Sequence, residues 1–241
     1  MVKSIVDRLQ SYRGILEVGP GPGVLTQPLS VTAEKLVAIE IDPVAISALS
    51  ETAPSATVRL VDVLEADLPS ILEELPTPRA LVSNMPYNIT GPLLTAFAEA
   101  KEHFDVAVLM MQKEVGERVL AQPGTRECGS LSIAMQAQFN IEKVCNAPGG
   151  AFFPPPKVDS VVLQFTPVPL GLDRSQAGSF FKLVRSGFVQ PRKTLLNNLL
   201  ASGWSKHSAE EALRALGLAL NIRPHQLGLE EWKRLSLYPL S

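Results

Sequence analysis

Cysteine, histidine and long apolar runs are scarce in this sequence, and each scarcity excludes a class of protein. Two cysteines, Cys128 and Cys145, and three histidines occur among 241 residues. The cysteines have neither a metal-binding spacing nor a disulfide framework, so we expect no metal site and a reduced, cytoplasmic protein. The longest apolar run, Val106–Met111, is far shorter than the ~18 residues of a membrane-spanning helix, and no signal peptide is visible.

A large net charge is also lacking, but the charge is unevenly distributed. The net charge is −2, yet residues 1–165 hold 12 basic and 19 acidic side chains, whereas residues 166–241 hold 10 basic and 5 acidic ones. A basic tail on an acidic body is expected if one lobe binds a polyanion, although solvated Lys and Arg on a small helical lobe would give the same count. The length and the 46% hydrophobic content suit one α/β domain with a small appendage.

A glycine-rich loop directly follows the first apolar run. Residues 15–18 read as a short strand, and Gly19-Pro20-Gly21-Pro22-Gly23 comes next. A strand, a glycine turn and a helix let the backbone approach a ligand closely. The spacing G-x-G-x-G differs from the dinucleotide fingerprint G-x-G-x-x-G, because residue 24 is Val. A tight strand-to-helix turn without a ligand remains the alternative.

The next two predicted strands also end in polar residues. The strand over 35–41 ends in Glu40-Ile41-Asp42, and Glu40 follows Gly19 at about the spacing at which an acidic residue holds ribose hydroxyls. The strand over 57–61 leads into Asp62, which can accept from an exocyclic amine while Val63 lies against the ring. The alternatives are a solvent-facing acid at Glu40 and a helix N-cap at Asp62, with Glu65 at the capping-box spacing.

The fourth strand ends in a segment that suggests a reaction. The apolar run 80–82 stops at Ser83, and Asn84-Met85-Pro86-Tyr87 follows. This segment suits a purine with an exocyclic amine. The amine hydrogens can be accepted by the Asn84 amide oxygen and by the Met85 or Pro86 carbonyl, and the flat ring of Tyr87 can stack on the base. Two acceptors on the amine hydrogens would localise its lone pair for attack. A strand-ending Asn-Pro turn is the alternative.

The remaining segments alternate between helical and strand patterns. We expect helices over 2–10, 43–52, 92–101 and 112–121, and β-like runs over 131–139 and 160–165. Between these runs, three successive prolines keep the segment after Phe152 and Phe153 extended, so either ring can face a base or fill the core edge. In the tail, Ser208 and Glu211 have the capping-box spacing that begins a helix, and Gly217 is placed to end it.

Six motifs resemble, in order, those of the ribosomal RNA adenine N6-dimethyltransferases. They are the segments 17–26, 38–42, 84–89, 112–115 and 152–160, and the run 192–195 with Asn198. The resemblance implies an α/β fold, with a class I (Rossmann-like) S-adenosylmethionine-dependent methyltransferase domain over 1–167 and a small helical RNA-binding domain over 168–241. It also implies dimethylation of two neighbouring adenosines in a hairpin loop near the 3′ end of small-subunit rRNA, by a monomer acting on the pre-ribosomal subunit.

The same resemblance assigns roles to individual residues. Asn84, Pro86 and Tyr87 would be catalytic, and Tyr87 and Phe152 would sandwich the target base. The residues implied to bind the cofactor are Glu17, Gly19, Gly21, Gly23, Glu40, Ile41, Asp62, Val63 and Asn84. Those implied to bind RNA are Lys113, Lys157, Arg185, Arg192, Lys193 and Arg223.

Several positions depart from the family pattern. Met85 replaces a usual Leu, Cys128 stands where Tyr is common, and Pro191 replaces an Arg and removes one phosphate contact. The family's Phe-x-Gln-Asn-Phe-Leu segment, which closes over the cofactor, has no counterpart before the first strand. We therefore expect an open pocket, weak cofactor binding and slow methylation.

Four other functions compete with this interpretation. Large-subunit rRNA methylases share the Asn-x-Pro-Tyr pattern, but the segment 152–160 and the long tail favour the small-subunit branch. An RNA-binding ribosome-assembly factor with little catalysis is the rival of a different class. A DNA adenine methylase would need a base-reading domain, and a nicotinamide dehydrogenase is disfavoured by the glycine spacing.

Overall fold

The computed structural model describes residues 1–151 and 158–238, which form two compact units. The first unit comprises Met1–Gly116 and Asn140–Pro167, and the second comprises Glu117–Phe139 and the described residues from Val168 onward. The predicted division after residue 167 therefore coincides with one boundary of the second unit. Residues 117–139, which we had assigned to the first domain, pack with the second instead.

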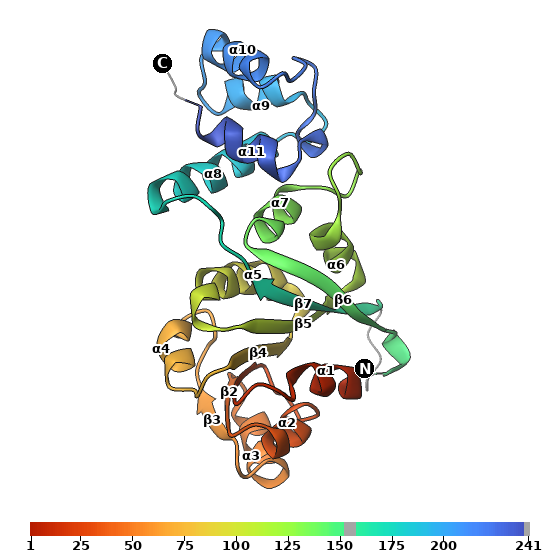
Figure 1. The fold of residues 1–241 in the computed structure, drawn as a ribbon. Coiled ribbons are helices and arrows are strands. Elements are labelled where there is room, and N and C mark those ends of the chain that lie inside the picture. Colours follow the sequence, from red (N-terminus) through yellow and green to blue (C-terminus); the bar gives the residue numbers. More distant parts are fainter. Residues whose placement is uncertain (152–157, 239–241) are drawn as a thin grey trace. The chain divides into compact units, whose positions relative to one another are not determined.

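The first unit contains a seven-stranded sheet with the order β3-β2-β1-β4-β5-β7-β6 (Figure 1). Its strands are β1 (Gly14–Val18), β2 (Lys35–Glu40), β3 (Thr57–Leu60), β4 (Arg79–Asn84), β5 (Val106–Gln112), β6 (Phe139–Ala147) and β7 (Ser160–Pro167). Strands β1 to β5 pair in parallel, and β7 is antiparallel to β5. The carboxyl ends of the parallel strands therefore share one edge, where open α/β sheets bind ligands.

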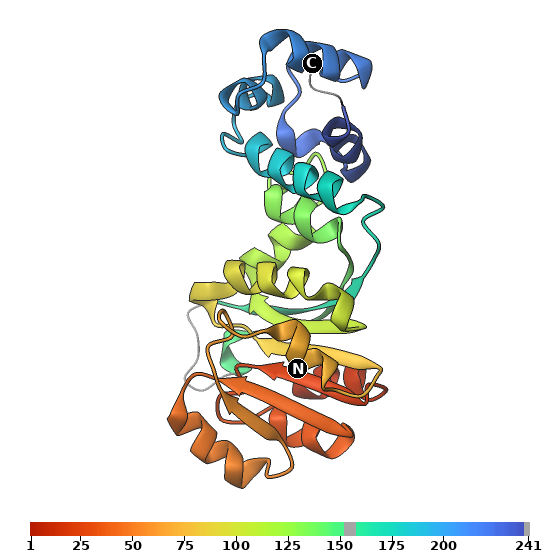
Figure 2. The ribbon, with the colours of Figure 1, turned by 90° about the vertical axis from the view of Figure 1, so that its left-hand side faces the viewer.

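Helices cover both faces of this sheet. On one face, α1 (Val2–Leu9) and α2 (Thr26–Thr32) contribute Ile5, Leu9 and Leu29 to a cluster with buried strand residues. On the other lie α4 (Leu68–Glu73) and α5 (Thr90–Glu99), as Figures 1 and 2 show, while α3 (Pro43–Thr52) packs on β2 and β3. Strands covered on both faces have near-continuous apolar sequences, which explains the apolar runs 80–82 in β4 and 106–111 in β5.

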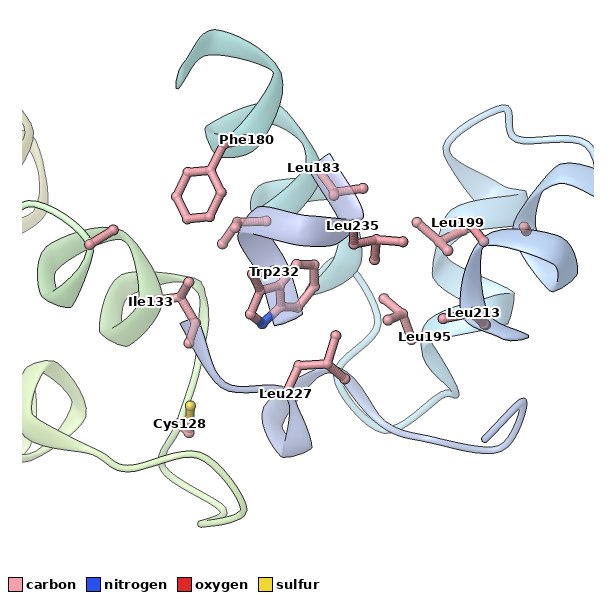
Figure 3. Packing of buried hydrophobic residues seen from close by; sticks show 14 of the residues in the cluster. Cys128, Ile133, Phe180, Leu183, Leu195, Leu199, Leu213, Leu227, Trp232 and Leu235 are labelled. Atoms are coloured by element: carbon pink, nitrogen blue, oxygen red, sulfur yellow. The ribbon is translucent and has the colours of Figure 1, made fainter. Parts of the chain in front are cut away.

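The second unit is a helical cluster built around Trp232, which is completely buried (Figure 3). Its helices are α7 (Ser130–Gln136), α8 (Arg174–Gly187), α9 (Leu195–Ala201), α10 (Lys206–Ala215) and α11 (Leu229–Ser236). The ring of Phe188 stacks on Trp232 with the centroids 5.5 Å apart. Leu195, Leu199 and Leu213 are buried there, and the partly buried Leu216 packs against the cluster.

Two local predictions were wrong. The β-like run over 131–139 comprises most of the helix α7, a turn at 137 and 138, and the first residue of β6. Apolar residues alternate in this run and imitate a strand, but Ile133 and Ala137, four positions apart, join the Trp232 cluster, which favours the helix. The cap of α10 is Ser205 rather than Ser208, because the Ser205 hydroxyl accepts from the Ser208 N–H at 3.0 Å.

The charge asymmetry follows the two structural units. The sequence segments of the first unit have a net charge of −7, and those of the second unit have a net charge of +5. The short segment 117–139 has no net charge, so assigning it to the second unit instead of the first leaves the charge difference unchanged.

Among the described helices, none combines the length and the apolar content that crossing a membrane requires.

Candidate active site

A pocket of about 310 Å³ lies at the carboxyl ends of β1 to β4. Its wall is formed by strand ends, by the turns that follow them and by the start of α5. The lining residues are Val18, Gly19, Ile39, Glu40, Ile41, Val61, Asp62, Val63, Leu64, Pro86, Asn88, Ile89 and Leu93. Five predicted cofactor residues thus come together here: Gly19, Glu40, Ile41, Asp62 and Val63. Glu17, Gly21, Gly23 and Asn84 are not among the lining residues.

The glycine loop adopts a backbone that requires glycine at three positions. Gly19, Gly21 and Gly23 have φ values of +70°, +53° and +85°, in the left-handed region. At Gly23 a side chain would also collide with α3, since a Cβ would lie 2.9 Å from the Leu49 Cδ2 atom. The loop therefore positions Gly19 at the pocket, while Gly21 and Gly23 shape the turn and hold it against α3.

Glu40 anchors this loop. Its Oε2 atom accepts from the Gly21 N–H at 3.1 Å, and its Oε1 atom accepts from the Ile41 and Asp42 N–H groups at 2.8 and 2.9 Å. Glu40 is 8% exposed and lines the pocket, which contradicts the solvent-facing alternative. The carboxylate thus shapes the loop as well as facing the ligand space. Sequence spacing had suggested only the second role.

The third strand end provides a polar group beside an apolar surface. The Asp62 Oδ1 atom accepts from the Leu64 N–H at 2.9 Å, which makes a local turn, and the helix α4 is capped by Asp67 instead. No donor in the described residues bonds to the other Asp62 carboxylate oxygen. Ile41 and Leu64 are apolar pocket residues that are 64% and 45% exposed. An acceptor flanked by exposed aliphatic groups fits an adenine ring with an exocyclic amine.

Asn84 is the last residue of β4. Hydrogen bonds of Met85 and Pro86 fix the turn that follows it. The Met85 N–H donates to the Met110 carbonyl of β5 at 3.0 Å, and the Met85 side chain is buried. The Pro86 carbonyl accepts from the Ile89 N–H and from the Thr90 hydroxyl, each at 3.2 Å. Both lone pairs of that carbonyl are therefore engaged.

Two acceptors in this turn remain without a partner in the described part of the chain. They are the side-chain amide oxygen of Asn84, which is exposed, and the Met85 carbonyl. Tyr87 begins the short 3₁₀ helix η1 (Tyr87–Ile89), and its hydroxyl lies 2.8 Å from the hydroxyl of Ser160. Ser160 was not singled out from the sequence, since no local pattern links it to Tyr87.

Glu17 is a buried carboxyl in β1, the strand that leads into the glycine loop. It is 2% exposed, and its Oε2 atom has no hydrogen-bond partner in the described residues. Burial raises the pKa of Glu17 to about 7, the neighbouring Thr26 hydroxyl lowers that pKa and the charge of Glu40 raises it. Glu17 is therefore a buried acid next to the glycine loop in sequence, and it does not line the pocket.

The predicted RNA-binding residues lie in different parts of the chain. Arg185, Arg192, Lys193 and Arg223 are exposed in the second unit, and none of them forms an ion pair within the described residues. Asn198 is buried and bonds to the Gln190 N–H, the Gln190 carbonyl and the Thr194 carbonyl, which holds the loop that carries Arg192 and Lys193. Lys113 is exposed in the first unit, and Phe152 and Lys157 lie outside the described residues.

The fold and the pocket together define a class of protein. A mainly parallel seven-stranded sheet with a glycine loop after β1, an acid at the end of β2 and an acceptor at the end of β3 defines a class I S-adenosylmethionine-dependent methyltransferase. The residues fit that cofactor, since Glu40 faces a nucleoside-sized space and Ile41 and Leu64 expose apolar surface to it.

Comparisons with known proteins identify the family. The model of the family described as ribosomal RNA adenine dimethylase matches residues 1–236, and the chain belongs to this family. The ribosomal RNA small subunit methyltransferase A of Macrococcus caseolyticus is 38% identical over 253 residues, covering 98% of this chain and 84% of the relative. The protein of the same name from Bacillus mycoides is 39% identical over 250 residues, covering 98% and 85%.

Two solved structures resemble the whole chain. A dimethyladenosine transferase from Plasmodium falciparum has a TM-score of 0.82 and 27% identity, covering 97% of this chain and 93% of that one. The 23S rRNA methyltransferase ErmE has a TM-score of 0.71 and 26% identity, covering 97% and 94%. The predicted fold class, family, enzyme class and cofactor are confirmed.

Proposed function

We propose that this protein transfers methyl groups from S-adenosylmethionine to the N6 atoms of two adjacent adenosines in a hairpin loop near the 3′ end of small-subunit rRNA. The observation that carries the proposal is the pair of free acceptors, the Asn84 amide oxygen and the Met85 carbonyl, beside the pocket at the end of β4. The relatives named as small subunit methyltransferases favour that substrate. We propose that the reaction takes place on a pre-ribosomal particle in the cytoplasm.

The two acceptors suit the target amine. An adenine N6 amine has two hydrogens, and its lone pair is delocalised into the ring. Accepting both hydrogens favours a pyramidal nitrogen whose lone pair is free to attack, and it stabilises the positive charge that grows there. From the sequence, both the Met85 and the Pro86 carbonyls suited the second acceptor, and the family resemblance favoured Pro86. Because the Pro86 carbonyl already accepts from Ile89 and Thr90, we assign this role to the Met85 carbonyl.

Alignment is the main requirement of this reaction, because the bound sulfonium is already a strong methyl donor. The chain therefore needs to hold the amine in line with the methyl–sulfur bond and to exclude competing water. Asn84 is exposed at the strand end, so the proton lost from the amine can pass to solvent. After the first transfer one N–H remains, and one of the two acceptors suffices to hold it for the second.

Tyr87 is proposed to stack on the target base, and the second unit to hold the RNA. A loop adenosine leaves its stack at the lowest energetic cost, which suits a hairpin substrate. The four exposed cations of the second unit, Arg185, Arg192, Lys193 and Arg223, lack acidic partners within the described residues and can contact phosphates. A monomer suffices for these roles.

The test is methyl transfer from radiolabelled S-adenosylmethionine to unmodified small and large ribosomal subunits, followed by nucleoside analysis. We expect N6,N6-dimethyladenosine in small-subunit rRNA, and no label with Asn84→Ala although its cofactor affinity stays within about tenfold of the wild type. Label in the large subunit alone would favour the large-subunit methylase. RNA binding without any label would favour an assembly factor.

A further inference from the structure

The hydroxyl of Tyr87 is held by a residue from another part of the first unit. The Tyr87 and Ser160 hydroxyl oxygens lie 2.8 Å apart, although the two residues are 73 positions apart in the sequence. Ser160 begins β7 and pairs in register with Gln112 of β5. It is completely buried, whereas Tyr87 is half-buried. The bond therefore joins a partly accessible ring to a fixed point in the sheet.

This bond limits how far the Tyr87 ring can move relative to its backbone. The turn itself is fixed by the bond from the Met85 N–H to the Met110 carbonyl and by the bond from the Thr90 hydroxyl to the Pro86 carbonyl. A tyrosine ring still rotates about two side-chain torsions, and a hydrogen bond at its far end restricts both. A restricted ring is a better wall for an extruded base, because the base must stay aligned with the methyl donor.

We infer that Ser160 is a positioning residue for methyl transfer, which acts by holding the Tyr87 ring in the orientation that stacks on the target base. The inference rests on the proposed function, in which Tyr87 contacts that base. It also gives a physical reason for tyrosine rather than phenylalanine at residue 87, since only the phenol can bond to Ser160. Neither residue lines the nucleoside pocket, so the effect should fall on the target base and not on cofactor binding.

A double-mutant cycle tests this inference. Tyr87→Phe, Ser160→Ala and the double variant are compared with the wild type for kcat, for KM toward unmodified small subunits and for the Kd of the cofactor. Misplacing a reacting group by about 1 Å can cost on the order of 100-fold. Because the ring itself is retained, we expect a smaller loss of about tenfold in kcat for each single variant. The double variant should lose no more than either single one, with the cofactor Kd unchanged.

Ser132→Ala is the matched control. Ser132 is also completely buried, and its hydroxyl bonds to the Arg118 carbonyl in the second unit. Its loss should lower thermal stability as the loss of Ser160 does, but should leave kcat unchanged. If the fold losses in kcat of the two single variants multiply in the double variant, the inference is overturned. A Tyr87→Phe protein with full turnover would also overturn it. Because Tyr87→Phe leaves β7 intact, it decides the question even if Ser160→Ala misfolds. An inactive wild type would instead refute the proposed function.

Discussion

At the scale of single residues, Glu17 combines deep burial with an ionisable group. Its side chain is buried in β1, and one carboxylate oxygen has no partner in the described residues. Burial raises the pKa of Glu17 from 4.5 to about 7. A carboxyl whose pKa is higher in the folded state stabilises the fold below its unfolded pKa, and that contribution is lost as the pH rises through the folded pKa.

Glu17→Gln should therefore change how stability depends on pH. The wild type should lose on the order of 3 kcal/mol of this contribution between about pH 4.5 and 7, from the size of the shift. The variant cannot titrate, so its free energy of unfolding relative to the wild type should increase over that range and level off above it. Denaturant unfolding followed by circular dichroism at pH 5 to 8 measures this. A constant difference would contradict it, and the exposed Glu51→Gln is the control.

Glu40 has two roles at the same carboxylate, since it holds the glycine loop and faces the pocket. Glu40→Ala should weaken cofactor binding by about 1.5–3 kcal/mol, as expected for the loss of hydrogen bonds to a charged group. Calorimetry with S-adenosylmethionine measures the change. Glu34→Ala is the control, because Glu34 forms only an exposed ion pair with Arg13. An affinity equal to that of the wild type would remove Glu40 from the binding site.

At the scale of elements, α8 contains two glycines in opposite environments. A Cβ at Gly187 would lie 2.3 Å from the Trp232 ring, whereas nothing lies within 4 Å of a Cβ at Gly178. Close approach of α8 and α11 therefore depends on the missing side chain of Gly187, and Gly178 has no such role.

Gly187→Ala should destabilise the second unit by about 1–3 kcal/mol through overpacking. Gly178→Ala should stabilise it by up to ~1 kcal/mol, because alanine favours a helix interior. Both tryptophans, Trp204 and Trp232, belong to the second unit, so tryptophan fluorescence during urea unfolding reports on it selectively. Equal effects of the two substitutions would show that the contact with Trp232 relaxes easily.

At the scale of the whole molecule, opposite charge is distributed between the two units. The net charge of +5 on the second unit already counts its acidic residues, and some of its basic side chains form ion pairs with them: Lys206 pairs with Glu210 and Lys233 with Glu230, at 3.9 and 3.3 Å. Arg192 and Lys193 have no such partner within the described residues. These two cations are therefore available to phosphates.

Neutralising Arg192 and Lys193 together, as glutamines, should flatten the dependence of log affinity on log salt by roughly 2 if both contact phosphates. Filter binding of hairpin RNA from 50 to 300 mM salt measures the slope. The matched control neutralises the ion-paired Lys206 and Lys233 and should leave the slope close to that of the wild type. Equal slopes for both double variants would assign Arg192 and Lys193 to another role.

The sequence by itself determined which residues lie at the ends of the strands that form the site, and it determined the class of the enzyme. Residues at consecutive positions form the glycine loop, and Glu40, Asp62 and Asn84 each lie at the end of a predicted strand. Such signals are local: closely spaced glycines permit the positive φ angles of a tight turn, and parallel strands place their carboxyl ends at one edge of a sheet. The pocket lined by Gly19, Glu40 and Asp62 is the result.

Only the tertiary structure decided which groups in the site are engaged and which are free. The bond of Glu40 to Gly21 spans 19 positions and that of Tyr87 to Ser160 spans 73, and no local periodicity encodes such contacts. The segment 131–139 alternates like a strand, but packing with the Trp232 cluster makes most of it helical. Burial and hydrogen-bond partners depend on the assembled sheet and helices, which is why the free Met85 carbonyl and the anchored Tyr87 ring became visible only there.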